Sequence, residues 1–283
     1  MRRANCMSPS PPLSSLRERI ASSNMPGRMT PSTATLTDQL RFTTIAHRDH
    51  VFLSPLSGPK VDQVLSMLEL PQGARVLDVG CGKGEMLVRL AGRWGARGVG
   101  VDVNPGFLAD ARQRAESRVP QAGLVFHEQS ACDFTAEPGS FDAVLCVGST
   151  EAYGGYRDAL RALASLVRSH GRVLVGERFW RRRPHPDYLA ALDLELEDLL
   201  DHPRNVRAGE EAGLVPICTA VSTEDEWDRY EGLYSRAVEE HAVRHPEDPE
   251  AEILWKRIRR HHEAWEHWGR DTLGFGLYVF QKK

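Results

Sequence analysis

The segment Val76-Leu77-Asp78-Val79-Gly80-Cys81-Gly82-Lys83-Gly84-Glu85 decides the fold. It joins a short apolar strand, which contains Asp78, to three closely spaced glycines and then to a helix that begins near Glu85. Glycine has no Cβ atom, so a ligand can approach the backbone closely. The N–H groups at the start of a helix can bind a carboxylate or a phosphate. The segment therefore predicts a site for a nucleotide-like ligand after the first strand of an α/β sheet.

Composition limits the class of protein. Of the 283 residues, 27% are charged and 41% are hydrophobic, and the formal net charge is -3. A protein with this slightly negative net charge is not expected to attract nucleic acid, although Arg178 and residues 181–183 form a local basic cluster. No apolar run approaches the roughly 18 residues of a membrane helix. The five cysteines include no C-x-x-C pair, so we expect no disulfide framework, no metal site and a reducing cytoplasm.

The order of elements is typical of a parallel sheet with crossover helices. Residues 1–36 are rich in Ser, Pro and Arg and have no sustained apolar period, so we expect a disordered extension. Residues 37–283 are expected to form one domain in which amphipathic helices alternate with apolar strands. Two of the predicted helices cover residues 60–70 and 158–167. The predicted strands cover residues 75–79, 98–101, 123–126, 143–147, 172–175, 215–221 and 272–280.

A helical lid is predicted between the last two strands, over residues 222–271. Its mixed charge and helical period predict two helices that are interrupted near His245-Pro246, because proline breaks a helix. We expect Trp255 and Trp265 to pack the lid against the sheet, since large aromatic side chains on helices are usually buried. Trp227 and Tyr230 are expected nearer the mouth of the site.

Asp102, at the end of the second strand, is the expected ribose ligand. In nucleotide-binding α/β units, a carboxylate about 20 residues after the glycine loop binds the ribose hydroxyls. The alternative is a helix N-cap, because Asn104-Pro105 follows and proline favours the first helical turn; the two roles are compatible. A nicotinamide oxidoreductase is disfavoured, because that class has the spacing G-x-G-x-x-G and this loop has G-x-G-x-G.

Residues 76–85 resemble motif I of the class I, Rossmann-like S-adenosylmethionine-dependent methyltransferases. Gly100-Val101-Asp102 resembles motif II, Ser130-Ala131-Cys132-Asp133-Phe134 resembles the stretch that contacts adenine, and Phe141-Asp142-Ala143-Val144 resembles motif IV. The resemblance covers roughly residues 40–283. It departs from the family at Ser130, where an acid usually holds the adenine amino group. That contact is weakened here or passes to Gln129 or Asp133.

A YjhP-like bacterial subgroup of this family is similar in further places. These are His47, His50 and Pro55, then Cys146-Val147-Gly148, Glu177 with Trp180, Trp227-Asp228-Arg229-Tyr230-Glu231, Arg270 and Gly274-x-Gly276. The resemblance implies a three-layer Rossmann-like sandwich, whose mostly parallel seven-stranded sheet has an antiparallel last strand. It also implies S-adenosylmethionine as the cofactor, but no particular substrate.

The candidate binding residues follow from this resemblance and from the ends of the strands, where ligands bind in open α/β sheets. Substrate residues are expected after strands four and five, before the glycine loop and in the lid. The substrate candidates are Glu151, Tyr153, Trp180, Trp227 and Tyr230. The candidates for binding the cofactor are Asp78, Gly80, Cys81, Gly82, Glu85, Asp102, Val103, Ser130, Ala131, Cys146 and Val147.

His47, His50 and Glu177 are the candidate catalytic residues. Either histidine could be a general base near neutral pH, could cap the cofactor or could pack the lid. A metal pair is disfavoured because no carboxylate or cysteine cluster accompanies them. Glu177 could accept a proton or bind a substrate amine, or could form a salt bridge to Arg178 or Arg181.

We expect in-line methyl transfer to a small-molecule acceptor, which requires a well-placed nucleophile and the exclusion of water. A non-catalytic S-adenosylmethionine-binding protein and a methyltransferase of macromolecules are the alternatives. The residues Cys146-Val147-Gly148-Ser149 after strand four differ from the N/D-P-P-Y/F of amino-methylating DNA enzymes and lack the Pro-Cys pair of RNA cytosine enzymes. The expected partner is therefore a small-molecule acceptor, without nucleic acid or membrane, and a homodimer is a possible assembly.

Overall fold

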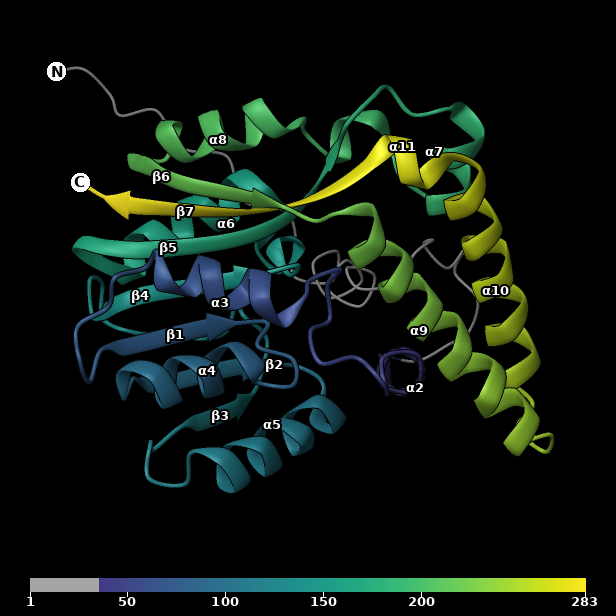
Figure 1. The fold of residues 1–283 in the computed structure, drawn as a ribbon, viewed down its shortest axis with the longest axis horizontal. Helices are drawn as coiled ribbons and strands as arrows, with labels where there is room; N and C mark the ends of the chain where they lie inside the picture. The colour runs from purple at the N-terminus through teal and green to yellow at the C-terminus, as the bar shows by residue number, and fades with distance from the viewer. Residues whose placement is uncertain (1–35) are drawn as a thin grey trace, which may run out of the picture.

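A seven-stranded sheet runs through residues 36–283, the part of the chain that this computed structural model describes (Figure 1). The strand order is β3-β2-β1-β4-β5-β7-β6, and β7 is antiparallel to both of its neighbours. The strands are β1 (Arg75–Val79), β2 (Arg97–Asp102), β3 (Val125–Glu128), β4 (Phe141–Val147), β5 (Val167–Trp180), β6 (Leu214–Val221) and β7 (Leu273–Lys282). The predicted fold class is confirmed. The predicted disordered extension falls on residues 1–35, outside the described residues, and on Leu36, which begins α2 (Leu36–Ala46).

Helices cover both faces of the sheet. Successive strand residues point to opposite sides, so each face has apolar side chains that a helix layer buries. Val76 packs in one core, against α3 (Gly58–Ser66) and α4 (Glu85–Trp94). Leu77 packs in a second core on the other face, where α6 (Tyr156–Leu166) and α8 (His202–Glu211) lie. The helix α5 (Pro105–Arg118) contributes Leu108 and Ala111 to the first core. The result is a three-layer sandwich.

The lid lies beyond the carboxyl ends of the parallel strands, on the right of Figure 1. It consists of α9 (Glu224–Arg244), α10 (Ala251–Ala264), the π-helical turn η3 (Trp265–Gly269) and α11 (Arg270–Thr272). The break between α9 and α10 includes His245-Pro246, where the sequence predicts it. A third apolar cluster joins the lid helices to α2 through Phe42, Tyr234 and Leu254. Short elements complete the chain: η1 (Thr150–Tyr153), α7 (Pro186–Leu192) and η2 (Leu196–Asp198).

Several predicted boundaries differ from the structure. β3 begins two residues later than predicted, after Gly123, whose φ of +63° belongs to a turn. α3 ends at Ser66, four residues before the predicted end. β5 covers residues 167–180, although only residues 172–175 are predicted. It extends to Trp180 because β7, which is about 100 residues distant in sequence, pairs with it from Arg172 to Trp180.

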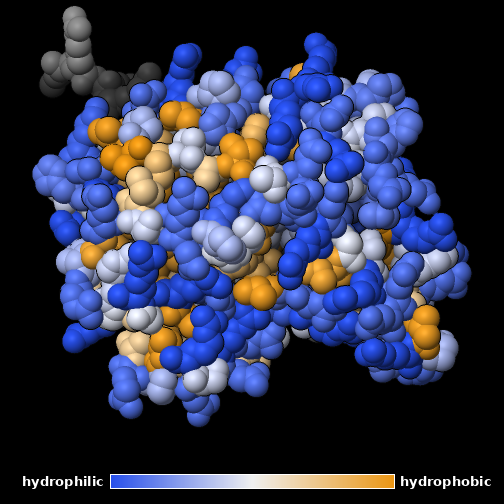
Figure 2. All heavy atoms as spheres, viewed as in Figure 1, coloured by the Kyte–Doolittle hydropathy of each residue, from blue (hydrophilic) through white to orange (hydrophobic). Residues whose placement is uncertain are grey.

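The face shown in Figure 2 is mostly hydrophilic, and its hydrophobic residues form small separate groups. The exposed hydrophobic side chains of the molecule include Val215 and Ile217 on the edge strand β6. Within residues 36–283, no helix is both long and apolar enough to cross a membrane.

Candidate active site

The glycine loop after β1 requires glycine both for its backbone conformation and for space. Gly80, Gly82 and Gly84 have φ values of +67°, +50° and +69°, in the left-handed region that favours glycine. A Cβ atom on Gly80 would lie 2.2 Å from Oγ of Ser149, and one on Gly82 would lie 2.6 Å from Cδ1 of Leu53. Gly84 is the N-cap of α4 and forms no side-chain cap. The first N–H groups of α4 therefore remain suited to an anionic group of a ligand.

The Asp102 side chain is hydrogen-bonded to this loop. Its Oδ2 atom accepts a hydrogen bond from the backbone N–H of Gly82 at 2.8 Å, and its Oδ1 atom accepts one from the N–H of Asn104 at 2.8 Å. The N-cap of α5 is Asn104, whose side chain accepts from the N–H groups of Gly106 and Phe107. The alternative prediction of an N-cap at Asp102 is therefore wrong. The Asp102 carboxylate lies beside the glycine loop, where the prediction of a ribose ligand requires it.

Asp78 is an acidic group beneath the same loop. Its side chain is 2% exposed. Burial, followed by repulsion from the nearby charge of Asp102, raises its pKa to about 8. A buried carboxyl in this state loses its proton more readily when a cation binds beside it, because the cation stabilises the charged form. The pair of acids therefore fits a ligand that carries ribose hydroxyls and a positive charge.

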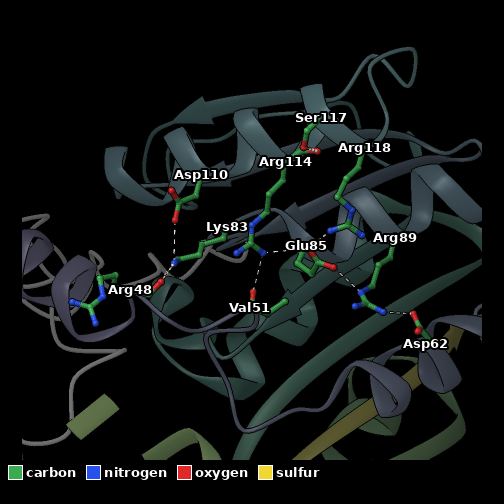
Figure 3. Close-up of polar contacts among 10 residues, drawn as sticks. All are labelled: Arg48, Val51, Asp62, Lys83, Glu85, Arg89, Asp110, Arg114, Ser117 and Arg118. Atoms are coloured by element: carbon green, nitrogen blue, oxygen red, sulfur yellow. Dashed lines mark hydrogen bonds and ion pairs between the residues drawn. The ribbon is translucent and has the colours of Figure 1, made fainter. Parts of the chain in front are cut away.

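Residues 47–57 cover the glycine loop. Lys83, which is 4% exposed, donates a hydrogen bond from Nζ to the Arg48 carbonyl at 2.9 Å and pairs with Asp110 at 3.0 Å (Figure 3). A narrow cavity separates the loop from the covering segment, and its lining includes Leu53, Ser54, Asp78 and Val147. The predicted cofactor residues Gly80, Cys81, Gly82 and Glu85 also line it.

Glu85 directs its carboxylate toward three arginines of α4 and α5 (Figure 3). Its oxygens lie 2.8 Å from Arg89 Nε, 2.6 Å from Arg118 and 3.2 Å from Arg114, and the side chain is 4% exposed. Arg114 also donates to the Val51 carbonyl at 3.3 Å. Glu85 thus joins the start of α4 to α5 and to the covering segment, and its contact with a cofactor stays a prediction.

The residues predicted at the adenine end lie beside Asp102. The N–H of Gln129 donates to the Asp102 carbonyl at 3.0 Å, which places Ser130 and Ala131 just beyond the end of β3. Ala131 is buried and Ser130 is half-buried, as is Val103 after β2. Cys146 is fully buried in β4, and burial raises the pKa of its thiol. These four cofactor contacts also stay predictions.

A second cavity lies between the ends of β4 and β5 and the lid, and we call it the acceptor cavity. Leu53 and Ser54 line both this cavity and the one at the glycine loop. Its apolar wall is formed by Leu192, Trp227, Tyr230, Tyr234, Trp265, Leu273 and Phe275. Its charged and ionisable lining residues are Glu151, Glu177, Arg178, Glu231 and His261. Three predicted substrate residues, Glu151, Trp227 and Tyr230, therefore come together here.

Glu177 reaches the acceptor cavity from β5. Its Oε2 atom accepts a hydrogen bond from the Thr150 hydroxyl, and its Oε1 atom accepts one from the backbone N–H of Arg178 at 2.8 Å. Burial, followed by repulsion from Glu151, raises the pKa of Glu177 to about 7. The Arg178 guanidinium pairs with Glu151 at 3.1 Å, and Arg181 donates to the Ser222 carbonyl. Glu177 is thus placed at the cavity with its oxygens already hydrogen-bonded.

His47 and His50 are buried between α2 and α9, away from the lining of both cavities. Their ring centroids are 4.9 Å apart, and each packs against Tyr230 and Tyr234. His50 Nε2 lies 3.0 Å from the Tyr230 carbonyl, and burial lowers the pKa of His50 to about 4. This arrangement favours lid packing among the roles considered for the pair.

Two predicted substrate residues lie outside the acceptor-cavity lining. Trp180 is 6% exposed and donates from Nε1 to the Leu196 carbonyl at 3.0 Å. Tyr153, in η1, packs against the core that contains Leu77. The sequence analysis did not predict Lys83, Leu53 and His261 as residues of the site. Their positions in the sequence do not indicate which distant segments they contact in the folded protein.

Comparisons with known proteins show that the chain is similar to methyltransferases. A family model described as a methyltransferase domain matches residues 76–171. YjhP of Escherichia coli is 28% identical over 241 residues, which are 84% of this chain and 97% of YjhP. A SAM-dependent methyltransferase of Geobacter sulfurreducens, solved in complex with S-adenosyl-L-homocysteine, has a TM-score of 0.81 and 27% identity, covering 86% of this chain and 98% of that one. A ubiquinone biosynthesis O-methyltransferase of Xanthomonas campestris is 38% identical over 125 residues, which are 44% of this chain and 50% of that protein.

The fold, the glycine loop with its two acids and the matched domain are those of a class I, Rossmann-like S-adenosylmethionine-dependent methyltransferase. The chain is similar in structure to YjhP, whose X-ray structure superposes with a TM-score of 0.81 and 27% identity over 86% of this chain and 100% of that one.

Proposed function

We propose that the protein methylates a small molecule held in the acceptor cavity. One observation carries this proposal: Leu53 and Ser54 line both the acceptor cavity and the glycine-loop cavity. A cofactor at the glycine loop and an acceptor under the lid would therefore be separated by a single pair of side chains. Such proximity is what an in-line displacement requires.

The bound cofactor would supply a methyl group activated on a sulfonium. In the proposed arrangement, the Asp102 carboxylate accepts hydrogen bonds from the ribose hydroxyls, and Asp78 offers a negative charge to the cationic part. The residues of the lid exclude water, because Trp227 and Trp265 stack at 4.7 Å and close one side of the acceptor cavity. Exclusion of water prevents hydrolysis and strengthens the electrostatic interactions inside the site.

The acceptor cavity favours a small acceptor over a macromolecule. Cavities lined mainly by aromatic side chains with a few polar groups are typical of small-molecule sites. Trp227, Tyr234 and Trp265 are each at most 4% exposed, so a folded polymer would have to displace the lid to reach them. The name of the matched Xanthomonas campestris enzyme, a ubiquinone biosynthesis O-methyltransferase, agrees with this size of acceptor.

Methyl-labelled S-adenosylmethionine tests the proposal. The purified protein is incubated with the labelled donor and an extract of the source cells, and the extract is then separated into small molecules, proteins and nucleic acids. We expect the label in the small-molecule fraction, and none with Asp102→Ala, which lacks the proposed ribose ligand. Label confined to protein or nucleic acid would contradict the proposal.

A further inference from the structure

Glu231 and His261 form a buried imidazole–carboxylate pair in the wall of the acceptor cavity. Glu231 lies on α9 and His261 on α10, so the pair exists only because these two helices pack together. His261 Nε2 is 3.1 Å from Oε2 of Glu231, and the two side chains are 8% and 4% exposed. Neither residue has a role in the site described above.

The geometry determines which nitrogen of His261 holds the proton. A carboxylate only accepts hydrogen bonds, so the bond to Glu231 places the proton of a neutral imidazole on Nε2. The Nδ1 atom then has a free lone pair. Nδ1 is buried and has no hydrogen-bond partner among residues 36–283. Buried polar atoms are nearly always hydrogen-bonded, so this atom requires an explanation, and a bound ligand would supply one.

Trp227 supplies a complementary group in the same cavity. Its indole Nε1–H is buried and also lacks a partner within the described part of the chain. The side chain is 4% exposed and stacks on Trp265. Two residues that line the cavity thus each carry an unpaired polar atom, an acceptor on His261 and a donor on Trp227. A flat molecule with a hydroxyl and a second oxygen would satisfy both.

We propose that His261 is the general base of the methyl transfer, that Glu231 positions it, and that the acceptor is a neutral, flat compound whose hydroxyl is methylated. This proposal rests on the proposed function and adds the type of acceptor atom. Other ionisable groups around the cavity are less suited: the Glu177 oxygens already accept hydrogen bonds from Thr150 and Arg178, and Glu151 pairs with Arg178.

The proton and the electrons balance in this step. The O–H bond of the acceptor breaks, and its proton moves to Nδ1 of His261. The oxygen forms a bond to the methyl carbon as the methyl–sulfur bond breaks, and the sulfur keeps that electron pair. The imidazole becomes positively charged beside the Glu231 carboxylate, which stabilises it. The proton then leaves to solvent when the product departs.

A first experiment measures the tautomer without needing an acceptor. The protein is labelled with 15N in its histidine rings, and His261→Gln assigns the His261 signals in NMR spectra at pH 8. We expect Nε2 to be protonated and Nδ1 unprotonated, and Glu231→Gln, whose amide can also donate, to give a mixture of tautomers. A proton on Nδ1 of the wild type would overturn the proposal. An unchanged tautomer in Glu231→Gln would overturn the positioning role.

A second experiment measures transfer from methyl-labelled S-adenosylmethionine to catechol and to ring-substituted catechols with more acidic hydroxyls. General-base catalysis contributes roughly 10²- to 10⁴-fold, so we expect His261→Gln to lower kcat by about that factor while the affinity for S-adenosylmethionine is unchanged. The loss should shrink as the hydroxyl becomes more acidic, because an acidic hydroxyl ionises without help. A loss independent of acidity, or no loss, would overturn the role as base.

His262→Gln is the matched control. His262 is the next residue on α10, and it pairs with Glu266 at 3.3 Å on the more exposed side of the helix; we expect wild-type transfer. Thermal unfolding of each variant separates misfolding from a loss of the base. If wild-type protein methylates small amines but no hydroxyl, the hydroxyl assignment is wrong while the proposed function stands. If it labels only macromolecules, the proposed function fails, and the tautomer measurement still decides whether Glu231 orients His261.

Discussion

The Asp102 carboxylate accepts a hydrogen bond from the backbone N–H of Gly82 at 2.8 Å, across 20 residues of sequence. This bond joins the end of β2 to the loop that follows β1. It holds a carboxylate beside the glycines even though burial raises the pKa of Asp102, because hydrogen bonds from backbone N–H groups stabilise the ionised form. The hydrogen bond therefore positions the proposed ribose ligand and the glycine loop relative to each other.

Asp102→Asn should weaken binding of S-adenosylmethionine by about 100-fold. Hydrogen bonds to a charged group contribute about 1.5–3 kcal/mol each and neutral ones about 1, and two ribose hydroxyls would be affected. Titration calorimetry measures the affinity. The control is Glu116→Gln, an exposed carboxylate on α5, which should bind normally. Equal affinities for Asp102→Asn and the wild type would remove Asp102 from the cofactor site.

Lys83→Met should loosen the segment that covers the glycine loop. The buried ammonium joins Arg48, before this loop, to Asp110 on α5, and loss of hydrogen bonds to a charged group costs about 1–3 kcal/mol of unfolding free energy. Hydrogen exchange of residues 48–54 should accelerate. The control is Lys256→Met, which removes an exposed salt bridge to Glu252 and should change the unfolding free energy by less than about 1 kcal/mol. Unaltered exchange in Lys83→Met would show that Lys83 does not hold this segment.

Asp78→Asn should change how the stability of the ligand-free protein depends on pH. Burial raises the Asp78 pKa to about 8 in the folded state, whereas an unfolded chain has an ordinary value near 3.9. Between these values the folded state binds the extra proton, so Asp78 makes the wild type less stable as pH rises from about 4 to 8. Asn does not titrate.

Urea unfolding at pH 5 and pH 8 measures this effect. The stability of Asp78→Asn relative to the wild type should increase from pH 5 to pH 8. The Glu116→Gln control should parallel the wild type at both pH values. A constant difference between Asp78→Asn and the wild type would mean that Asp78 is ionised in the folded protein throughout this range.

Glu85→Gln should lower stability without weakening S-adenosylmethionine binding. Its carboxylate pairs with Arg89, Arg114 and Arg118, which are partly exposed and can be rehydrated, so we expect a loss of about 1–3 kcal/mol. Thermal unfolding and calorimetry measure the two quantities on one sample. A parallel loss of affinity would instead establish the cofactor contact that the sequence predicts for Glu85.

The fold was largely predictable from local patterns. Apolar strands, amphipathic helices and the interruption at His245-Pro246 are properties of short segments, and the structure has all of them. One missed boundary, the end of β5 at Trp180, depends on a distant partner, because β7 pairs with β5 up to that residue. Similarly, the N-cap of α5 at Asn104 could not be separated from Asp102 by spacing alone.

The sequence by itself determined the class of the protein, because the glycine loop, Asp78 and Asp102 lie in or directly after consecutive strands, where parallel pairing must bring them together. Only the tertiary structure decided the acceptor cavity. Its walls come from residues 53–55, the ends of β4 and β5, α7, β7 and the lid. No local pattern specifies how two helices such as α9 and α10 are rotated against each other. That rotation buries His47 and His50 away from the cavity and brings Glu231 to His261 at its wall, since side-chain contacts between distant segments form only when the core packs.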